Sequence, residues 1–237
     1  MSESALEMVI LTGAGISAES GVATFRGADG LWEGHRFEDV ASPEGFRRDP
    51  GLVHRFYNLR RAGLERVEPN AAHEALVRLE REWRGRFLLV TQNVDDLHER
   101  AGSERLVHMH GELRKVRCEG CDGVWEWAGD LGTGDACVYC GRVGVVRPDI
   151  VWFGEMPYHM DEILGALGRC GIFVSVGTSG SVYPAAGFVD MARRVGARTV
   201  ECNVAETSAS ELFGERRTGL ATVVVPALVE ELLGSAG

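Results

Sequence analysis

The stretch MVILTGAGISAESG, residues 8–21, decides how this chain folds. An apolar run of strand length ends at Thr12, and a glycine-rich turn then leads into a helix start. Gly13, Gly15 and Ala18 form a G-x-G-x-x-A pattern, in which glycines let the backbone approach a pyrophosphate and a helix N-terminus offers unpaired N–H groups. The stretch therefore predicts a first strand followed by a phosphate-binding turn.

The pattern departs from that of an ordinary dinucleotide-binding dehydrogenase. Glycine turns before helices are common, so the three positions alone are weak evidence. No acidic residue closes a second strand about 20 residues further on, where such enzymes hold the ribose. The chain instead enters GVATFRGADGLW, residues 21–32. A phosphate turn is indicated, but a standard dehydrogenase is not.

Apolar runs alternate with helical patterns along most of the remaining chain. Further strands are predicted within residues 86–93, 105–111, 144–154, 170–179, 197–203 and 221–226, and helices at 70–83, 159–169, 184–195 and 226–233. This alternation is typical of a parallel sheet covered by helices on both faces, so the fold class is α/β. Residues 26–67 and 113–145 break the alternation and together predict one small domain, with a ligand cleft between it and the sheet.

Four of the six cysteines have metal-ligand spacing. Cys118, Cys121, Cys137 and Cys140 form C-x2-C-x15-C-x2-C, which is typical of a tetrahedral zinc site. Two disulfides are the alternative, but they are uncommon in chains without a secretory signal. Four thiolates leave no open position for water, so the predicted zinc is structural. The remaining two, Cys170 and Cys202, fall at apolar strands and are expected to be buried.

Composition narrows the choice of function. The net charge of −10 argues against a general nucleic-acid binder, because phosphate neutralisation needs clustered cations. No apolar run reaches membrane-spanning length, and residues 1–7 lack the features of a signal peptide. A cytoplasmic protein is therefore expected.

Small polar residues follow three of the predicted strands. They are Gln92, Asn93 and Asp95 after the second, Gly177, Thr178 and Ser179 after another, and Asn203 after a third. Helix capping by Asn93 or Asp95 is an equally good explanation of the first group. Because the carboxyl ends of parallel strands share one edge, all three groups together predict a site for one extended, hydroxyl-rich ligand.

Two histidines close the strand before the cysteines. His108 and His110 have the same parity and share one face, with Met109 on the other. A histidine at a strand end is more often structural than catalytic, but the expected cleft favours a chemical role for His110. Zinc ligation by it would be superfluous beside four thiolates.

These motifs together resemble the sirtuins, the NAD-dependent protein deacylases. The matching segments are GAGISAESGVATFRG, TQNVDDLHERAG, HMHGELRKVRC, the paired cysteines, VRPDIVWFGEMP, GTSGSVYPAAGF and CNVAE, in the family's order over nearly the full length. The resemblance implies a Rossmann-like NAD-binding domain (1–25, 68–112 and 146–237). It also implies a small domain made of a helical module (26–67) and a zinc module (113–145).

The resemblance also implies how NAD and acyl-lysine bind. The implied cofactor residues are Gly13, Ala14, Gly15, Glu19, Thr24, Phe25, Arg26, Trp32, Gln92, Asn93, Asp95, Gly177, Thr178, Ser179, Asn203 and Ala221. Two positions depart from the family pattern: Ala205 replaces an acidic residue, and the segment around Ala221 matches loosely. Val151, Phe153, Gly154 and Glu155 are implied to pair with an extended substrate peptide as an added strand.

His110 and Asn93 are the implied catalytic residues. In the family, the acyl oxygen attacks the nicotinamide ribose, nicotinamide leaves, and a histidine then activates a ribose hydroxyl. A neutral imidazole suits that step near physiological pH, so His110 is the expected general base. The products would be free lysine, nicotinamide and O-acyl-ADP-ribose.

The helix after Asp49-Pro50 carries Tyr57 and Arg60 three residues apart. From the helix alone, a solvent-facing arginine beside a core-edge tyrosine is the better interpretation. The chain, however, resembles the sirtuin subclass with Tyr-x-x-Arg here and a small residue, Ala28, beside the acyl pocket. That subclass removes succinyl, malonyl and glutaryl groups, and its bacterial members also remove acetyl.

Other functions remain open at this point. A plain deacetylase and a mono-ADP-ribosyltransferase would keep the same fold, and a non-catalytic NAD or ADP-ribose sensor would keep only the binding site. A zinc-dependent nucleic-acid module is opposed by the charge. Acyl-lysine proteins or peptides are the expected partners, without nucleic acid or membrane, and a monomer is expected.

Overall fold

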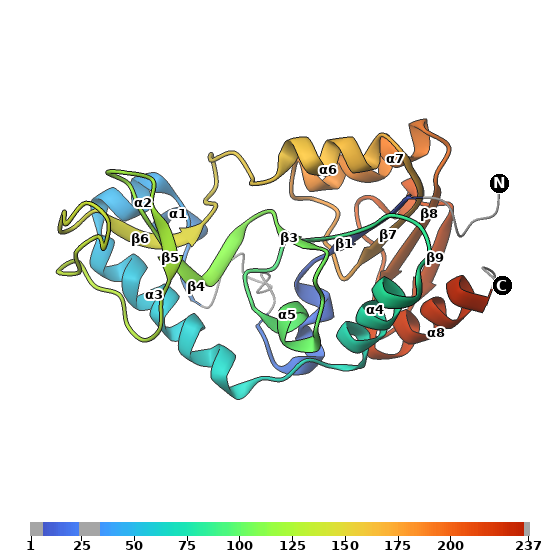
Figure 1. Ribbon diagram of the computed structural model, residues 1–237, viewed down its shortest axis with the longest axis horizontal. Coiled ribbons are helices and arrows are strands. Elements are labelled where there is room, and N and C mark those ends of the chain that lie inside the picture. Colours follow the sequence, from blue (N-terminus) through green and yellow to red (C-terminus); the bar gives the residue numbers. More distant parts are fainter. Residues whose placement is uncertain (1–6, 24–33, 235–237) are drawn as a thin grey trace.

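The computed structural model describes residues 7–23 and 34–234 of the chain. A larger part contains the main sheet and both described ends of the chain, and a smaller part lies beside it (Figure 1). Within these described ranges, no helix has the length and apolar character needed to cross a bilayer.

The larger part is built on a six-stranded sheet in which all paired neighbours run parallel. Its order is β3-β2-β1-β7-β8-β9. The strands are β1 (Glu7–Thr12), β2 (Phe87–Thr91), β3 (Leu106–His108), β7 (Cys170–Val176), β8 (Arg198–Asn203) and β9 (Glu215–Thr218). The predicted α/β class is therefore confirmed, and the ends of β1, β2, β7 and β8 share one edge.

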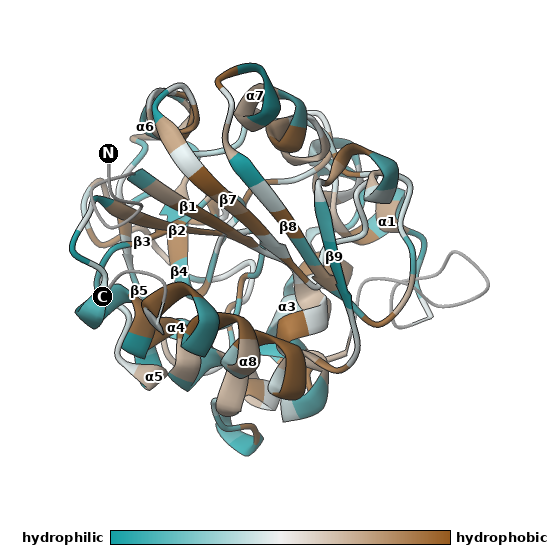
Figure 2. Cartoon of the chain, turned by 90° about the vertical axis from the view of Figure 1, so that its right-hand side faces the viewer, coloured by the Kyte–Doolittle hydropathy of each residue, from teal (hydrophilic) through white to brown (hydrophobic). Residues whose placement is uncertain are grey.

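Both faces of this sheet are covered by helices (Figure 2). Met8 and Ile10 of β1 point to the face covered by α4 (Ala71–Glu82) and α8 (Ala221–Gly234). Val9 and Leu11 point to the opposite face, under α6 (Met160–Leu167) and α7 (Phe188–Arg194). Because successive side chains alternate between faces, a strand buried on both sides must be apolar throughout, as β1 is.

The prediction of a strand at residues 221–226 is wrong, because this segment is the first part of α8. Its β-branched residues suggest a strand. Burial follows a helical period instead: Ala221, Val225, Leu228, Val229 and Leu232 are all buried in the core shared with α4. Tertiary packing against that helix outweighs the local propensity.

Strand β9 was not predicted because its sequence, ERRT, carries three charges. It forms the outer edge of the sheet, where Glu215 pairs with Arg198 of β8 (2.6 Å). Charged side chains are tolerated at an edge because one side of the strand faces solvent.

In its described residues, the smaller part contains a three-stranded antiparallel sheet and three α-helices. Its strands are β4 (Gly111–Cys118), β5 (Val124–Glu126) and β6 (Val146–Ile150), in the order β5-β4-β6. The helices are α1 (Phe37–Val40), α2 (Pro43–Arg48) and α3 (Pro50–Gly63). The strand expected at residues 144–154 is present as β6, but it pairs with β4 and not with the parallel sheet. An apolar run indicates that a strand is buried, but it does not indicate which strand it pairs with.

Helix α3 begins as its sequence predicts. The Asp49 side chain accepts a hydrogen bond from the Leu52 backbone N–H (2.8 Å), and Pro50 occupies the first turn. Val53, Phe56 and Tyr57 of this helix are buried, whereas Leu59 is 75% exposed. A separate short helix, α5 (Leu97–Ala101), follows β2 in the larger part.

Candidate active site

The glycine turn after β1 packs directly against the end of β7. Backbone N–H groups of Gly13 and Gly15 donate to the carbonyl oxygens of Val176 and Gly177 (3.0 and 2.9 Å). A Cβ atom on Gly15 would lie 2.6 Å from the Cα of Gly177, which itself has φ +62°. Only glycine allows this approach of two backbones. The expected helix start is two 3-10 turns, Ala14–Ile16 and Ala18–Ser20.

The same edge brings together several of the residues predicted to bind NAD. Asn203 donates from Nδ2 to the Thr178 carbonyl (2.7 Å), and the half-buried Ser179 is next in the chain. The Glu19 carboxylate accepts hydrogen bonds from the Thr222 N–H (3.0 Å) and hydroxyl (2.6 Å), next to Ala221. A polar cavity of about 70 Å³ adjoins this group, lined in part by Asn203, Ala205 and Thr218. Polar residues from four distant segments therefore lie together at this edge.

The segment after β2 supplies the middle of the site. Asn93 is buried and donates from Nδ2 to Ser17 Oγ of the glycine turn (3.1 Å). Asp95 accepts from the Leu97 N–H (3.2 Å), but the N-cap residue of α5 is Asp96, so the alternative of helix capping by Asn93 or Asp95 is wrong. Burial raises the pKa of Asp95, partly offset by hydrogen bonds from Leu97 and Ser17. Ser17 was not singled out from the sequence, although it lies within the motif.

His110 lies at the junction of the two parts of the molecule. Its Nδ1 is 3.2 Å from the carbonyl oxygen of Gln92, and its own carbonyl accepts from the Val151 N–H (2.9 Å). Because a carbonyl can only accept, Nδ1 carries the hydrogen and Nε2 is the basic nitrogen. Burial lowers the pKa of His110, partly offset by the bond to Gln92. The ring is therefore neutral at physiological pH.

His108 shares the predicted parity with His110 but has a different environment. Its Nδ1 is 2.9 Å from the Asn93 carbonyl oxygen and its Nε2 is 2.6 Å from Glu99 Oε1. Both partners accept, so His108 donates from both nitrogens as an imidazolium. Burial lowers the pKa of His108, but the Glu99 carboxylate, with Glu112 nearby, outweighs burial and raises it overall. The sequence contained no signal for this ion pair.

We expect the His108–Glu99 pair to make stability depend on pH. A folded-state pKa above the unfolded value of about 6.5 means that the stabilisation is complete below that value. It is lost as the pH rises through the folded pKa. His108→Gln should therefore cost about 1–3 kcal/mol at pH 6 and less at pH 9, measured by urea unfolding. His159→Asn, at an exposed histidine, is the control; an equal cost at both pH values would contradict the ion pair.

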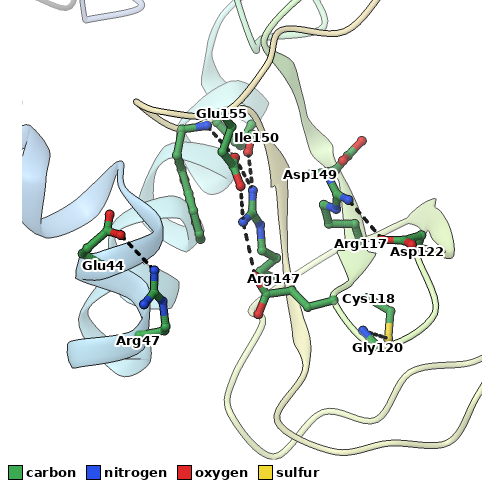
Figure 3. Close-up of polar contacts among 12 residues, drawn as sticks. Glu44, Arg47, Arg117, Cys118, Gly120, Asp122, Arg147, Asp149, Ile150 and Glu155 are labelled. Atoms are coloured by element: carbon green, nitrogen blue, oxygen red, sulfur yellow. Dashed lines mark hydrogen bonds and ion pairs between the residues drawn. The ribbon is translucent and has the colours of Figure 1, made fainter.

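The four cysteines form a compact group at the far end of the small sheet. Their sulfur atoms all lie within 4.8 Å of one another, and the Cys118–Cys140 and Cys121–Cys137 pairs are each 3.7 Å apart. A tetrahedral site with Zn–S bonds of about 2.3 Å has S–S edges of about 3.8 Å. A disulfide would need about 2.05 Å. The Gly120 N–H also donates to Cys118 Sγ (3.3 Å; Figure 3). The donor set therefore fits structural zinc.

Tyr57 is fully buried and Arg60 is half-buried on α3. The Arg60 guanidinium carbon lies 5.6 Å from the centre of the Phe56 ring. Burial raises the pKa of Tyr57, although a hydrogen bond from Trp152 and the charge of Arg60 act against it. Arg60 is thus turned toward the interior, unlike a solvent-facing arginine.

Five predicted residues lie outside the described part of the chain: Thr24, Phe25, Arg26, Ala28 and Trp32.

The segment predicted to bind the substrate peptide follows β6. The backbone N–H groups of Val151, Trp152 and Phe153 donate to His110 O, the Glu155 carboxylate and Ala41 O. Gly154 has φ +92°, and the Glu155 carboxylate is also bonded to Arg147. An added peptide strand would therefore have to use other backbone groups of this segment. Phe153 itself is 42% exposed.

The fold and this site define a class of protein: a parallel-sheet nucleotide-binding domain joined to a small zinc-ligating domain, with a neutral histidine between them. The family model of the Sir2 family matches residues 13–184. This chain belongs to the Sir2 family.

Several known proteins are similar over most of their length. An NAD-dependent protein deacylase of Bdellovibrio bacteriovorus is 58% identical over 228 residues, covering 95% of this chain and 96% of the relative. A Sir2 homologue solved with NAD superposes with a TM-score of 0.89 at 37% identity, covering 100% of this chain and 93% of that one. A Sir2 variant solved with a deacetylated p53 peptide and 3′-O-acetyl-ADP-ribose has a TM-score of 0.83 at 28% identity, covering 94% and 92%.

Proposed function

We propose that this protein is an NAD-dependent protein-lysine deacylase in which His110 is the general base and Asn93 helps to hold the reacting ribose. One observation carries the assignment: the bond from His110 Nδ1 to the Gln92 carbonyl leaves Nε2 as the basic nitrogen. The lowered pKa keeps that nitrogen unprotonated at neutral pH. The similarity to deacylases and to Sir2 proteins solved with NAD and with a deacetylated peptide supports the same reaction.

NAD and the acyl-lysine peptide would bind to different elements of the structure. NAD would lie along the edge formed by the ends of β1, β2, β7 and β8, with its phosphates at the glycine turn. The acyl-lysine peptide would bind along residues 151–155, whose backbone is joined to that of His110. The acyl oxygen would attack the ribose carbon that carries nicotinamide, so that the bond from that carbon to nicotinamide breaks and nicotinamide leaves. His110 would take the proton of a neighbouring ribose hydroxyl, whose oxygen would then attack the acyl carbon. Water would complete the cleavage of the acyl–nitrogen bond, which releases lysine and O-acyl-ADP-ribose. The zinc stabilises the small domain and takes no part.

We further propose that the acyl pocket prefers dicarboxylic groups such as succinyl, with acetyl also accepted. Tyr57 and Arg60, one turn apart on α3, can converge on one carboxylate. Burial keeps the Tyr57 phenol protonated, so it can donate, and Arg60 supplies the positive charge. The test is kcat/KM with NAD on matched succinyl-lysine and acetyl-lysine peptides, following O-acyl-ADP-ribose by mass. Acetyl turnover without succinyl turnover would leave a plain deacetylase, and ADP-ribosylated protein would indicate a transferase.

Arg60→Met is expected to lower the succinyl-to-acetyl ratio of kcat/KM by about 10- to 100-fold. The reason is the loss of a sheltered, charge-assisted bond worth about 1.5–3 kcal/mol, which only a carboxylate can form. Arg55→Met removes an exposed arginine of the same helix and should leave the ratio unchanged. Parallel losses on both peptides in Arg60→Met would reject the carboxylate-binding role.

A further inference from the structure

Trp152 contacts the proposed carboxylate-binding tyrosine directly. Its indole Nε1 donates a hydrogen bond to the Tyr57 hydroxyl oxygen at 3.0 Å, and both side chains are buried. The two residues are 95 positions apart in the chain and come from different elements. Trp152 follows β6, within the segment proposed to bind the peptide, whereas Tyr57 lies in the middle of α3.

Trp152 is held on its ring and on its backbone by one ion pair. The Arg147 guanidinium carbon lies 3.6 Å from the centre of a Trp152 ring. Arg147 donates to both carboxylate oxygens of Glu155 (2.8 and 2.7 Å; Figure 3). The Arg147 side chain is only 3% exposed. The same carboxylate accepts the Trp152 backbone N–H (2.9 Å). Cation–π contact and bidentate pairing together give the indole one orientation.

The direction of this hydrogen bond determines where the hydroxyl hydrogen of Tyr57 can point. An indole N–H can only donate, so the Tyr57 oxygen must accept from Trp152. The hydrogen of the phenol is consequently directed away from the indole. A phenol that accepts on one side and donates on another is suited to a carboxylate, which can only accept. An acetyl methyl group gains nothing from this arrangement.

We infer that Trp152 is a specificity-determining residue that sets Tyr57 as a hydrogen-bond donor to the distal carboxylate of the acyl group. Arg147 and Glu155 are positioning residues that act through Trp152. Glu155 would then serve acyl recognition indirectly, in addition to any contact with the peptide. The inference rests on the proposed role of Tyr57 in binding dicarboxylic acyl groups.

Filling of the core by Trp152 is the competing explanation, and it can be tested separately. The indole packs among Phe46, Tyr57 and other residues of one buried cluster. Trp152→Phe keeps an aromatic ring but removes the N–H donor. Phe46→Leu loosens the same cluster, 5.2 Å from the indole by ring centres, without touching the hydrogen bond. The two variants separate loss of packing from loss of the donor.

The experiment is a double-mutant cycle read as the succinyl-to-acetyl ratio of kcat/KM, using Trp152→Phe, Tyr57→Phe and the double variant. Trp152→Phe should lower the ratio by about 3- to 10-fold, mostly through the KM for the succinyl peptide. In the Tyr57→Phe background it should change the ratio no further, and Phe46→Leu should leave it as it is. If Trp152→Phe folds poorly, 3-benzothienylalanine introduced at position 152 by nonsense suppression removes only the N–H and should give the same ratio.

Two results would overturn the inference alone. One is an unchanged ratio in Trp152→Phe, and the other is a full further loss in the Tyr57→Phe background. Absence of succinyl turnover by the unmodified chain would instead overturn the proposed acyl preference, and this inference with it.

Discussion

His110→Asn is expected to lower the production of O-acyl-ADP-ribose by about 10²- to 10⁴-fold, the usual contribution of a positioned general base. Asparagine can still donate to the Gln92 carbonyl, so the local backbone should be retained while the basic nitrogen is lost. Formation of O-acyl-ADP-ribose by mass is the direct measurement. Exchange of labelled nicotinamide into NAD precedes the step assigned to His110 and should fall far less.

The pH dependence of kcat/KM is a second test of the role of His110. Burial lowers the pKa of His110, and the base must be neutral to act. The acid limb of kcat/KM in the unmodified chain should therefore lie below about 6.5, with activity lost as pH falls through it. His159→Asn is the matched control, since His159 is exposed and has φ +59°, which asparagine accepts. Nicotinamide exchange falling as far as deacylation would show that His110 acts earlier or only structurally.

Cys137→Ala is expected to abolish zinc binding and to destabilise the small domain by about 5 kcal/mol or more, because zinc binding and local folding are coupled. For a chain of this size, that corresponds to a fall in Tm of roughly 10–20 °C. Zinc content by mass spectrometry should drop from about one ion per chain to nearly none.

The control for this variant is Cys170→Ala, which removes a buried cysteine of β7 that is remote from the four sulfur atoms. It should keep its zinc, at the lesser cost of a small core truncation. Full zinc content in Cys137→Ala would contradict the four-thiolate site. In the unfolded, metal-free unmodified chain, a thiol reagent should find all six cysteines free; two free thiols would indicate two disulfides instead.

The parts of the fold that could be predicted are those in which one local pattern has one structural outcome. The strand β1 and its glycine turn are of this kind, because a doubly buried strand must be apolar and the close approach to Gly177 requires glycine. The cysteine spacing is equally direct. The edge strand β9 and the start of α8 were missed, because charge and β-branching there describe exposure and propensity, and the partner element decides the structure.

The candidate site divides in the same way. Motif residues at strand ends, such as Asn93 and Asn203, could be placed because parallel strands bring their carboxyl ends to one edge. The contacts that orient side chains of the site join different segments of the chain: Ser17 to Asn93, Glu99 to His108, and Trp152 to Tyr57. A pattern within one segment carries no information about such pairs.

The antiparallel pair β4–β6 determines where the small domain can differ in length. Its near end begins at Gly111, where a Cβ atom would lie 2.0 Å from the Asp149 carbonyl oxygen, and the preceding His110 is bonded to Val151. Its far end carries the cysteines. The segment between Glu119 and Val145 extends from this far end. Its two ends are held together by a hydrogen bond from the Glu119 backbone N–H to the Val145 carbonyl oxygen (2.8 Å). Insertions or deletions at its exposed turn around Thr133 and Gly134, away from β5, Leu131 and the four cysteines, change the length of a surface loop. They leave the spacing between the base and the peptide-binding segment as it is.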